Sequence, residues 1–70
     1  MQAIHLKATA RSAEWAASAV TWTLRRIVGV KDVAVLASLG IVSVLFDERV
    51  ATTEQILAAV RRVGFDAKVL

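Results

Sequence analysis

The sequence predicts a small α+β domain in which four strands and two helices follow one another in the order βαββαβ. Three segments alternate apolar residues with a period of two, and two longer segments repeat apolar residues with a helical period. Glycines fall at the ends of these segments, and the chain contains no proline. Because no linker or low-complexity stretch interrupts the 70 residues, we expect a single domain spanning 1–70.

The first strand and the first helix are predicted for residues 2–8 and 13–28. Ser12 is a suitable N-cap, and Glu14 suits the positive end of the helix dipole. Gly29 follows as the helix stop. The inward strand face and the buried helix stripe consist of apolar residues: Ile4, Leu6, Ala8, Ala16, Val20, Leu24 and Ile27.

The second half of the chain predicts a hairpin, a helix and a last strand. Strands are expected at 30–37 and 41–46, joined by a short loop at 38–40. Thr52 opens the second helix, and Gln55 three residues later completes a capping box. Gly64 ends this helix, and residues 65–70 form the last strand. The inward residues are Val33, Val35, Ala37, Val42, Val44, Phe46, Ile56, Val60 and Val63.

The packing of these elements follows from the handedness of their connections. Right-handed crossovers place both helices on one face of a four-stranded antiparallel sheet, which is the ferredoxin-like arrangement. With 57% hydrophobic residues the chain can supply the core of such a sandwich without disulfides, and it contains no cysteine.

Composition argues against several classes of function. We expect no enzyme, because there is no catalytic triad, no phosphate-binding glycine loop and no carboxylate pair on a common face. We expect no nucleic-acid partner, because the central strands offer only His5 and Leu45 outward and no aromatic ring for base stacking. No apolar run is long enough to span a bilayer and no secretory signal is seen. We therefore expect a cytoplasmic location without direct membrane insertion.

Three segments, taken in order, resemble the heavy-metal-associated (HMA) domain family. They are GVKDVAV at 29–35, IVSVLFD at 41–47 and TTEQILAAVRRVGFDA at 52–67. This family supplies copper chaperones and the N-terminal domains of metal-transporting P-type ATPases. The resemblance implies metal transport, with copper as the metal, and a protein partner that is a metal-transporting ATPase or a carrier domain.

The two cysteines with which the family binds metal are absent. Counting back from Gly29 places the Cys-x-x-Cys positions at Ala13 and Ala16. Monovalent copper prefers soft thiolate ligands, and an alanine methyl group donates nothing. We therefore expect no metal site and no cofactor in this chain, although copper or another soft metal would bind if the cysteines were restored. The predicted neighbours of this loop are Ser12, Glu14, Trp15 and Phe65.

Two origins of this Cys-less sequence remain open. The domain is either a cysteine-to-alanine variant of a metal carrier or regulatory domain, or a natural degenerate form. An alternative function also remains, namely a protein-interaction or dimerisation module that keeps the fold without binding metal.

Two groups of side chains form a candidate partner surface. Trp15 and Trp22 lie seven residues apart, off the buried helix stripe, and Arg25 or Arg26 can stack on Trp22. Either the rings cover the edge of the core, or they dock a partner. The outer sheet face is expected to carry three aliphatic residues, which would suit a homo-oligomer or a neighbouring domain: Leu36, Ile41 and Leu45.

Overall fold

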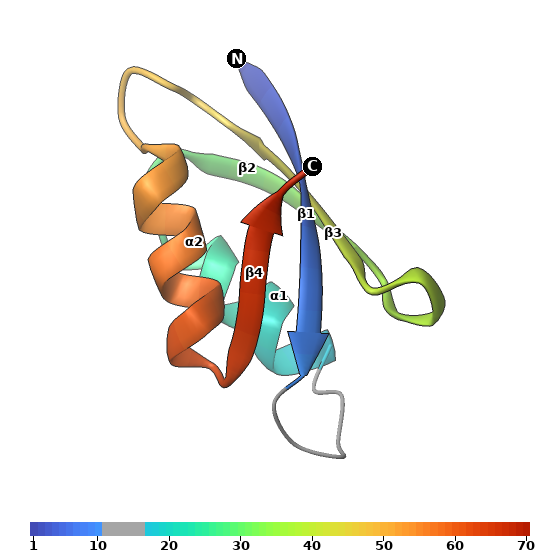
Figure 1. The fold of residues 1–70 in the computed structure, drawn as a ribbon. Helices are drawn as coiled ribbons and strands as arrows, with labels where there is room; N and C mark the ends of the chain where they lie inside the picture. The colour runs from blue at the N-terminus through green and yellow to red at the C-terminus, as the bar shows by residue number, and fades with distance from the viewer. Residues whose placement is uncertain (11–16) are drawn as a thin grey trace.

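The computed structural model describes residues 1–10 and 17–70. Its elements are β1 (Gln2–Ala10), α1 (Ala17–Arg25), β2 (Val30–Leu36), the 3-10 turn η1 (Ala37–Leu39), β3 (Ile41–Phe46), α2 (Thr53–Arg62) and β4 (Phe65–Val69). The strands form one sheet in the order β2-β3-β1-β4, and every paired neighbour is antiparallel. Both helices cover the same face of this sheet (Figure 1). The predicted ferredoxin-like α+β fold is confirmed.

The core lies between the sheet and the two helices. Alternate residues of the central strands point inward, as the period of two predicts: Ile4, Leu6, Ala8, Val42, Val44 and Phe46 are buried. The helices bury Val20, Leu24, Ile56, Leu57, Ala59 and Val60 against them. Val35 on the edge strand is only partly buried, as are Ile27 and Val63 at the helix ends. The apolar surface removed from water here is the main stabilising contribution to the fold.

The end of α1 differs from the prediction. The apolar stripe predicts a helix that continues to Val28, but α1 ends at Arg25. The carbonyl of Leu24 accepts a hydrogen bond from the N–H of Ile27 at 3.1 Å, so the last turn tightens before the chain enters β2. Ile27 still packs on the core, which is why the helical spacing of apolar residues continues past the true end. The predicted start at residue 13 lies outside the described residues, as does the Ser12 cap.

Smaller boundary differences also have tertiary causes. β1 continues beyond residue 8 to Ala10 because β4 pairs with it as far as Phe65. The predicted strand 30–37 ends one residue earlier, because Ala37 begins the η1 turn. The last strand ends at Val69.

Helix α2 begins and ends as predicted. The N–H of Gln55 donates to Thr52 Oγ1 at 3.1 Å, and the N–H of Thr52 donates to Gln55 Oε1 at 2.9 Å, which completes the capping box. Val63 caps the C-terminus, and Gly64 follows with a φ of 108°.

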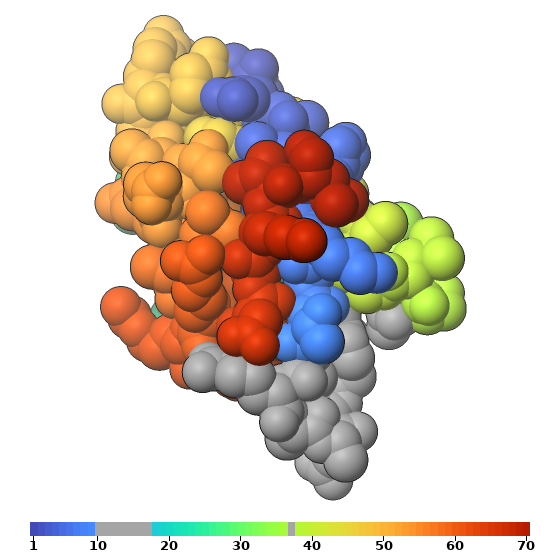
Figure 2. All heavy atoms as spheres, in the orientation of Figure 1, coloured from blue at the N-terminus to red at the C-terminus, as the bar shows by residue number. Residues whose placement is uncertain are grey.

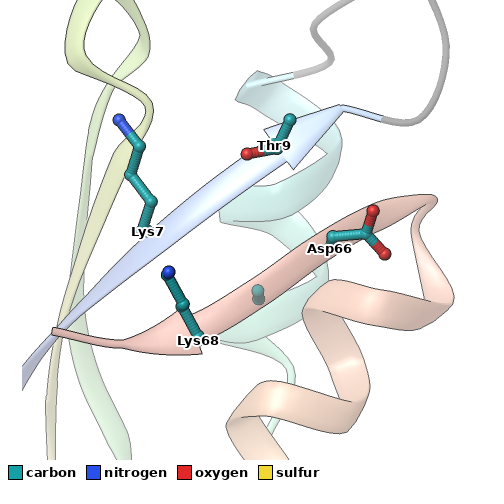
Figure 3. Close-up of a pocket in the computed structure, with 5 residues that line it drawn as sticks. Lys7, Thr9, Asp66 and Lys68 are labelled. Atoms are coloured by element: carbon teal, nitrogen blue, oxygen red, sulfur yellow. The ribbon is translucent and has the colours of Figure 1, made fainter.

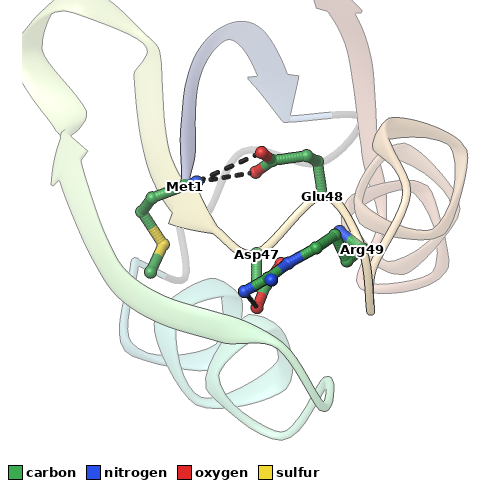
Figure 4. A network of polar contacts seen from close by, with 4 residues as sticks. All are labelled: Met1, Asp47, Glu48 and Arg49. Atoms are coloured by element: carbon green, nitrogen blue, oxygen red, sulfur yellow. Dashed lines mark hydrogen bonds and ion pairs between the residues drawn. The ribbon is translucent and has the colours of Figure 1, made fainter.

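A polar network closes the loop between β3 and α2 (Figure 4). Arg49 donates from Nε and Nη2 to the two carboxylate oxygens of Asp47 at 3.1 and 3.2 Å. The N–H of Arg49 also donates to Asp47 Oδ1, at 3.0 Å. These hydrogen bonds hold the pKa of Asp47 below its ordinary value, and those from the Arg49 side chain have the largest effect. The Met1 ammonium group meets Glu48 at 3.0 Å.

Candidate functional site

The predicted ligand positions belong to the connection between β1 and α1. The C-terminal end of β1, the start of α1 and the turn between α2 and β4 all lie at the same end of the domain (Figure 1). The register places Phe65 opposite Ala10, the last residue of β1, and the Phe65 side chain is buried. The candidate loop residues Ser12, Ala13, Glu14, Trp15 and Ala16 lie outside the described residues.

The chain lacks the thiolate donors that soft metal ions prefer. The sequence contains no cysteine, so no thiolate is available at any position. Within residues 1–10 and 17–70, no three histidine, aspartate or glutamate side chains gather into a potential metal site. The His5 ring lies on the outer sheet face, where its Nδ1 is 2.7 Å from Ser43 Oγ. The chain therefore lacks the thiolate pair that suits monovalent copper.

The helical face of the domain exposes a tryptophan beneath an arginine. The Trp22 side chain is 64% exposed, and the guanidinium carbon of Arg26 lies 4.6 Å from the centre of its ring. This distance is typical of a cation–π interaction. Arg25 instead forms an exposed ion pair with Asp32, at 3.3 Å. Of the two arginines that the spacing allowed, Arg26 is the one that stacks.

A groove of about 320 Å³ lies between the two helices. The residues that line it come from α1 and the turn after it, and from α2: Thr23, Arg26, Ile27, Ala59 and Arg62. No local pattern in the chain associates Arg62 with Arg26, because their place on one groove depends on how α1 packs against α2. The helical period shows only that Arg62 lies off the buried stripe.

A second hollow, of about 260 Å³, lies on the outer face of the sheet (Figure 3). Lys7 on β1 is directly opposite Lys68 on β4, and Thr9 is opposite Asp66. Lys7 Nζ donates to the carbonyl of Leu39 at 2.8 Å, so this ammonium group already has an acceptor. The alternation of the first strand places Lys7 on the outer face but does not identify Lys68 as its partner across the sheet.

The three aliphatic residues predicted for the outer face do lie on it, and Ser43 lies between Ile41 and Leu45 along β3. Leu36 is 48% exposed and lies opposite Ile41, which is half-buried. Leu45 is 38% exposed and lies further along β3, beyond Ser43. In the space-filling view, the turn of the β2–β3 hairpin projects at the side of β1 (Figure 2). A partner role for these residues stays a prediction.

No family model matches this chain, and comparison with curated proteins finds no match. Solved structures do match it over nearly its full length. A copper-binding domain from HMA7, a P-type ATPase, superimposes with a TM-score of 0.91 at 24% identity, covering 100% of this chain and 95% of the other. The CopZ metallochaperone gives 0.86 at 29% identity, covering 99% and 100%.

The apo form of the copper chaperone of Enterococcus hirae gives a TM-score of 0.85 at 25% identity, covering 96% of this chain and 98% of the other. Chaperones and ATPase domains therefore both resemble the chain, as its ordered sequence segments predict. No helix among the described residues is long and apolar enough to cross a membrane. The chain has the fold of the heavy-metal-associated domains of copper chaperones and P-type ATPases, and it contains no cysteine.

Proposed function

We propose that this chain is a non-enzymatic domain of the copper-trafficking class, a carrier or regulatory domain that lacks its own metal ligands. The observation that carries the proposal is a structural match, over nearly the full length, to a copper-binding ATPase domain and a copper chaperone, in a chain with alanine at positions 13 and 16. Its site of action would be the cytoplasm. Its partner would be a metal-transporting ATPase or another carrier domain.

The chemistry of the ligand pair explains what such a domain keeps and what it loses. Two thiolates one helical turn apart clamp monovalent copper, whereas two methyl groups cannot coordinate it. The buried core and the strand pairing do not depend on the metal, because they are formed by apolar side chains and backbone hydrogen bonds. Such a domain retains its protein surfaces but neither receives nor delivers copper.

Titration with monovalent copper against a strong competing chelator tests this proposal. The unmodified chain should take no stoichiometric copper, and the Ala13→Cys/Ala16→Cys variant should take one ion per chain. Ser18→Cys/Thr21→Cys is the matched control, because it places two thiols at the same spacing further along the chain, within α1. A one-to-one complex of copper with the unmodified chain would contradict the proposal that the chain lacks its own metal ligands. Equal binding by the two double variants would contradict a preformed site at 13 and 16.

The exposed aliphatic residues of the outer sheet face favour a second candidate function, a protein-interaction or dimerisation module. Leu36 and Leu45 are both exposed on a face that the helices leave uncovered. A homodimer formed through this face would appear in light scattering as twice the mass of the chain. A monomer at high protein concentration would contradict the dimerisation form of this function.

A further inference from the structure

The hollow on the outer face of the sheet brings two ammonium groups to opposite positions. The register pairs Lys7 on β1 with Lys68 on β4, and both side chains lie on the face that the helices leave uncovered (Figure 3). Like charges on directly opposite residues of an antiparallel pair repel each other and destabilise the sheet. Among the described residues, neither lysine forms an ion pair with a carboxylate. An anion bound between the two ammonium groups would remove this repulsion.

A hydrogen bond holds one of the two ammonium groups in place and leaves it able to bind. Lys7 Nζ donates to the carbonyl of Leu39 at 2.8 Å, which uses one of the three N–H donors of the group. Because this bond ties the Lys7 side chain to the η1 turn, less rotamer freedom is lost when an anion binds. The Thr9 hydroxyl lies two residues further along β1 and adds another donor to the hollow.

A carboxylate in the same hollow decides which anion fits. Asp66 is directly opposite Thr9 and lines the hollow together with the two lysines. An ionised carboxylate accepts hydrogen bonds at about four positions and donates none. It therefore repels an anion unless that anion donates a hydrogen bond to it. Hydrogen phosphate keeps an O–H group at neutral pH, whereas sulfate has none and a phosphate monoester has mostly lost its own.

We propose that this hollow binds inorganic hydrogen phosphate, with Lys7, Lys68 and Thr9 donating to its oxygens and its O–H group donating to Asp66. Lysine suits this role because its compact charge carries three rotatable donors, which can follow a tetrahedral anion. A water molecule occupies about 30 Å³ of the liquid, so a hollow of about 260 Å³ has room for the ion and some of its hydration water. The proposal goes beyond the proposed function, because it depends neither on copper nor on a protein partner.

An NMR titration of the full chain with sodium phosphate, at constant pH and ionic strength, tests the site. The amides of Thr9, Ala67 and Lys68 should shift saturably. Lys68→Gln should weaken phosphate binding about fivefold or more, because it removes a charged hydrogen-bond donor. Lys31→Gln is the matched control, since it removes the same charge from an exposed position of β2 outside the hollow. The control should change the affinity less than about twofold.

The choice of anion tests the role given to Asp66. Sulfate and glycerol phosphate, titrated in the same way, should each bind about fivefold or more weakly than inorganic phosphate, because neither donates a hydrogen bond to the carboxylate. Asp66→Asn keeps the shape of the side chain and removes its charge, so this variant should largely lose the preference. The amides of the core residues Val44 and Ile56 should stay in place in every variant, which shows that the fold is retained.

Three results would overturn the proposal. They are shifts that do not saturate, equal weakening by Lys68→Gln and Lys31→Gln, and sulfate or glycerol phosphate binding as tightly as inorganic phosphate. A preference for phosphate that persists unchanged in Asp66→Asn would contradict the hydrogen bond to the carboxylate.

Discussion

The carbonyl oxygen of Gly29 accepts a 2.7 Å hydrogen bond from the N–H of Asp47, which joins the turn after α1 to the loop after β3. Gly29 has a φ of 102°, and a Cβ built on it would lie 3.0 Å from the Cβ of Val50 and 3.2 Å from that of Ala51. Two connections that are distant in sequence therefore meet where only glycine fits.

Gly29→Ala should lower the free energy of unfolding by about 1–3 kcal/mol, because it adds steric overlap to backbone strain. Chemical denaturation measures this loss. Gly64→Ala is the control, since Gly64 has a similar φ of 108° but a Cβ added to it would meet no other atom within 4 Å. Gly64→Ala should lower the free energy of unfolding by less than Gly29→Ala does. Equal losses would mean that Val50 and Ala51 move aside at no cost.

Leu24→Ala should leave the domain largely unfolded near body temperature. The Leu24 side chain is fully buried, and removing such a side chain costs about 2–5 kcal/mol, against a total stability of about 5 kcal/mol for a domain of this size. Trp22→Ala should cost less than half as much, because its ring lies on the surface. Denaturation curves of the two variants test the assignment of the helix faces, and similar losses would contradict it.

The stability of the domain should fall in acid partly through Asp47. Its hydrogen bonds from Arg49 lower its pKa below the ordinary value of 3.8 in the folded protein. The stabilisation that the ionised Asp47 carboxylate gives the folded protein is therefore complete well above pH 3.8. It is lost as the pH falls below 3.8 and passes through the lowered pKa of the folded state. Urea midpoints measured across this range should decline less steeply for Asp47→Asn. If the urea midpoint of Asp47→Asn declined with pH as steeply as that of the unmodified chain, Asp47 would not contribute to the acid sensitivity.

Leu45→Glu should abolish self-association if the outer sheet face forms a homodimer. A carboxylate buried in such an interface would have no partner, whereas the monomer would hold it in water. Light scattering measures the mass, and circular dichroism checks that the fold is retained. Ala58→Glu introduces the same charge at an exposed position of α2 and should leave the dimer intact. Dissociation by both changes would indicate a non-specific charge effect.

Some elements were determined by local sequence alone. The strand at Ile41–Phe46 has the predicted bounds, because alternating apolar residues are interrupted on both sides by residues that end a strand. The start of α2 follows from Thr52 and Gln55, whose reciprocal hydrogen bonds involve only four consecutive residues. Where the physical cause lies within a few residues, the sequence was sufficient.

Tertiary packing decided the rest. Helix α1 ends at Arg25 although Ile27 continues the apolar stripe, because a residue can reach the core from a turn as well as from a helix. That Arg26 and Arg62 line one groove depends on the packing of α1 against α2, which no local pattern specifies. The absence of thiolates could be read directly from the sequence, because a metal ligand is a property of a single residue. The groove between the helices could be recognised only in the fold, because it is formed by residues of two helices.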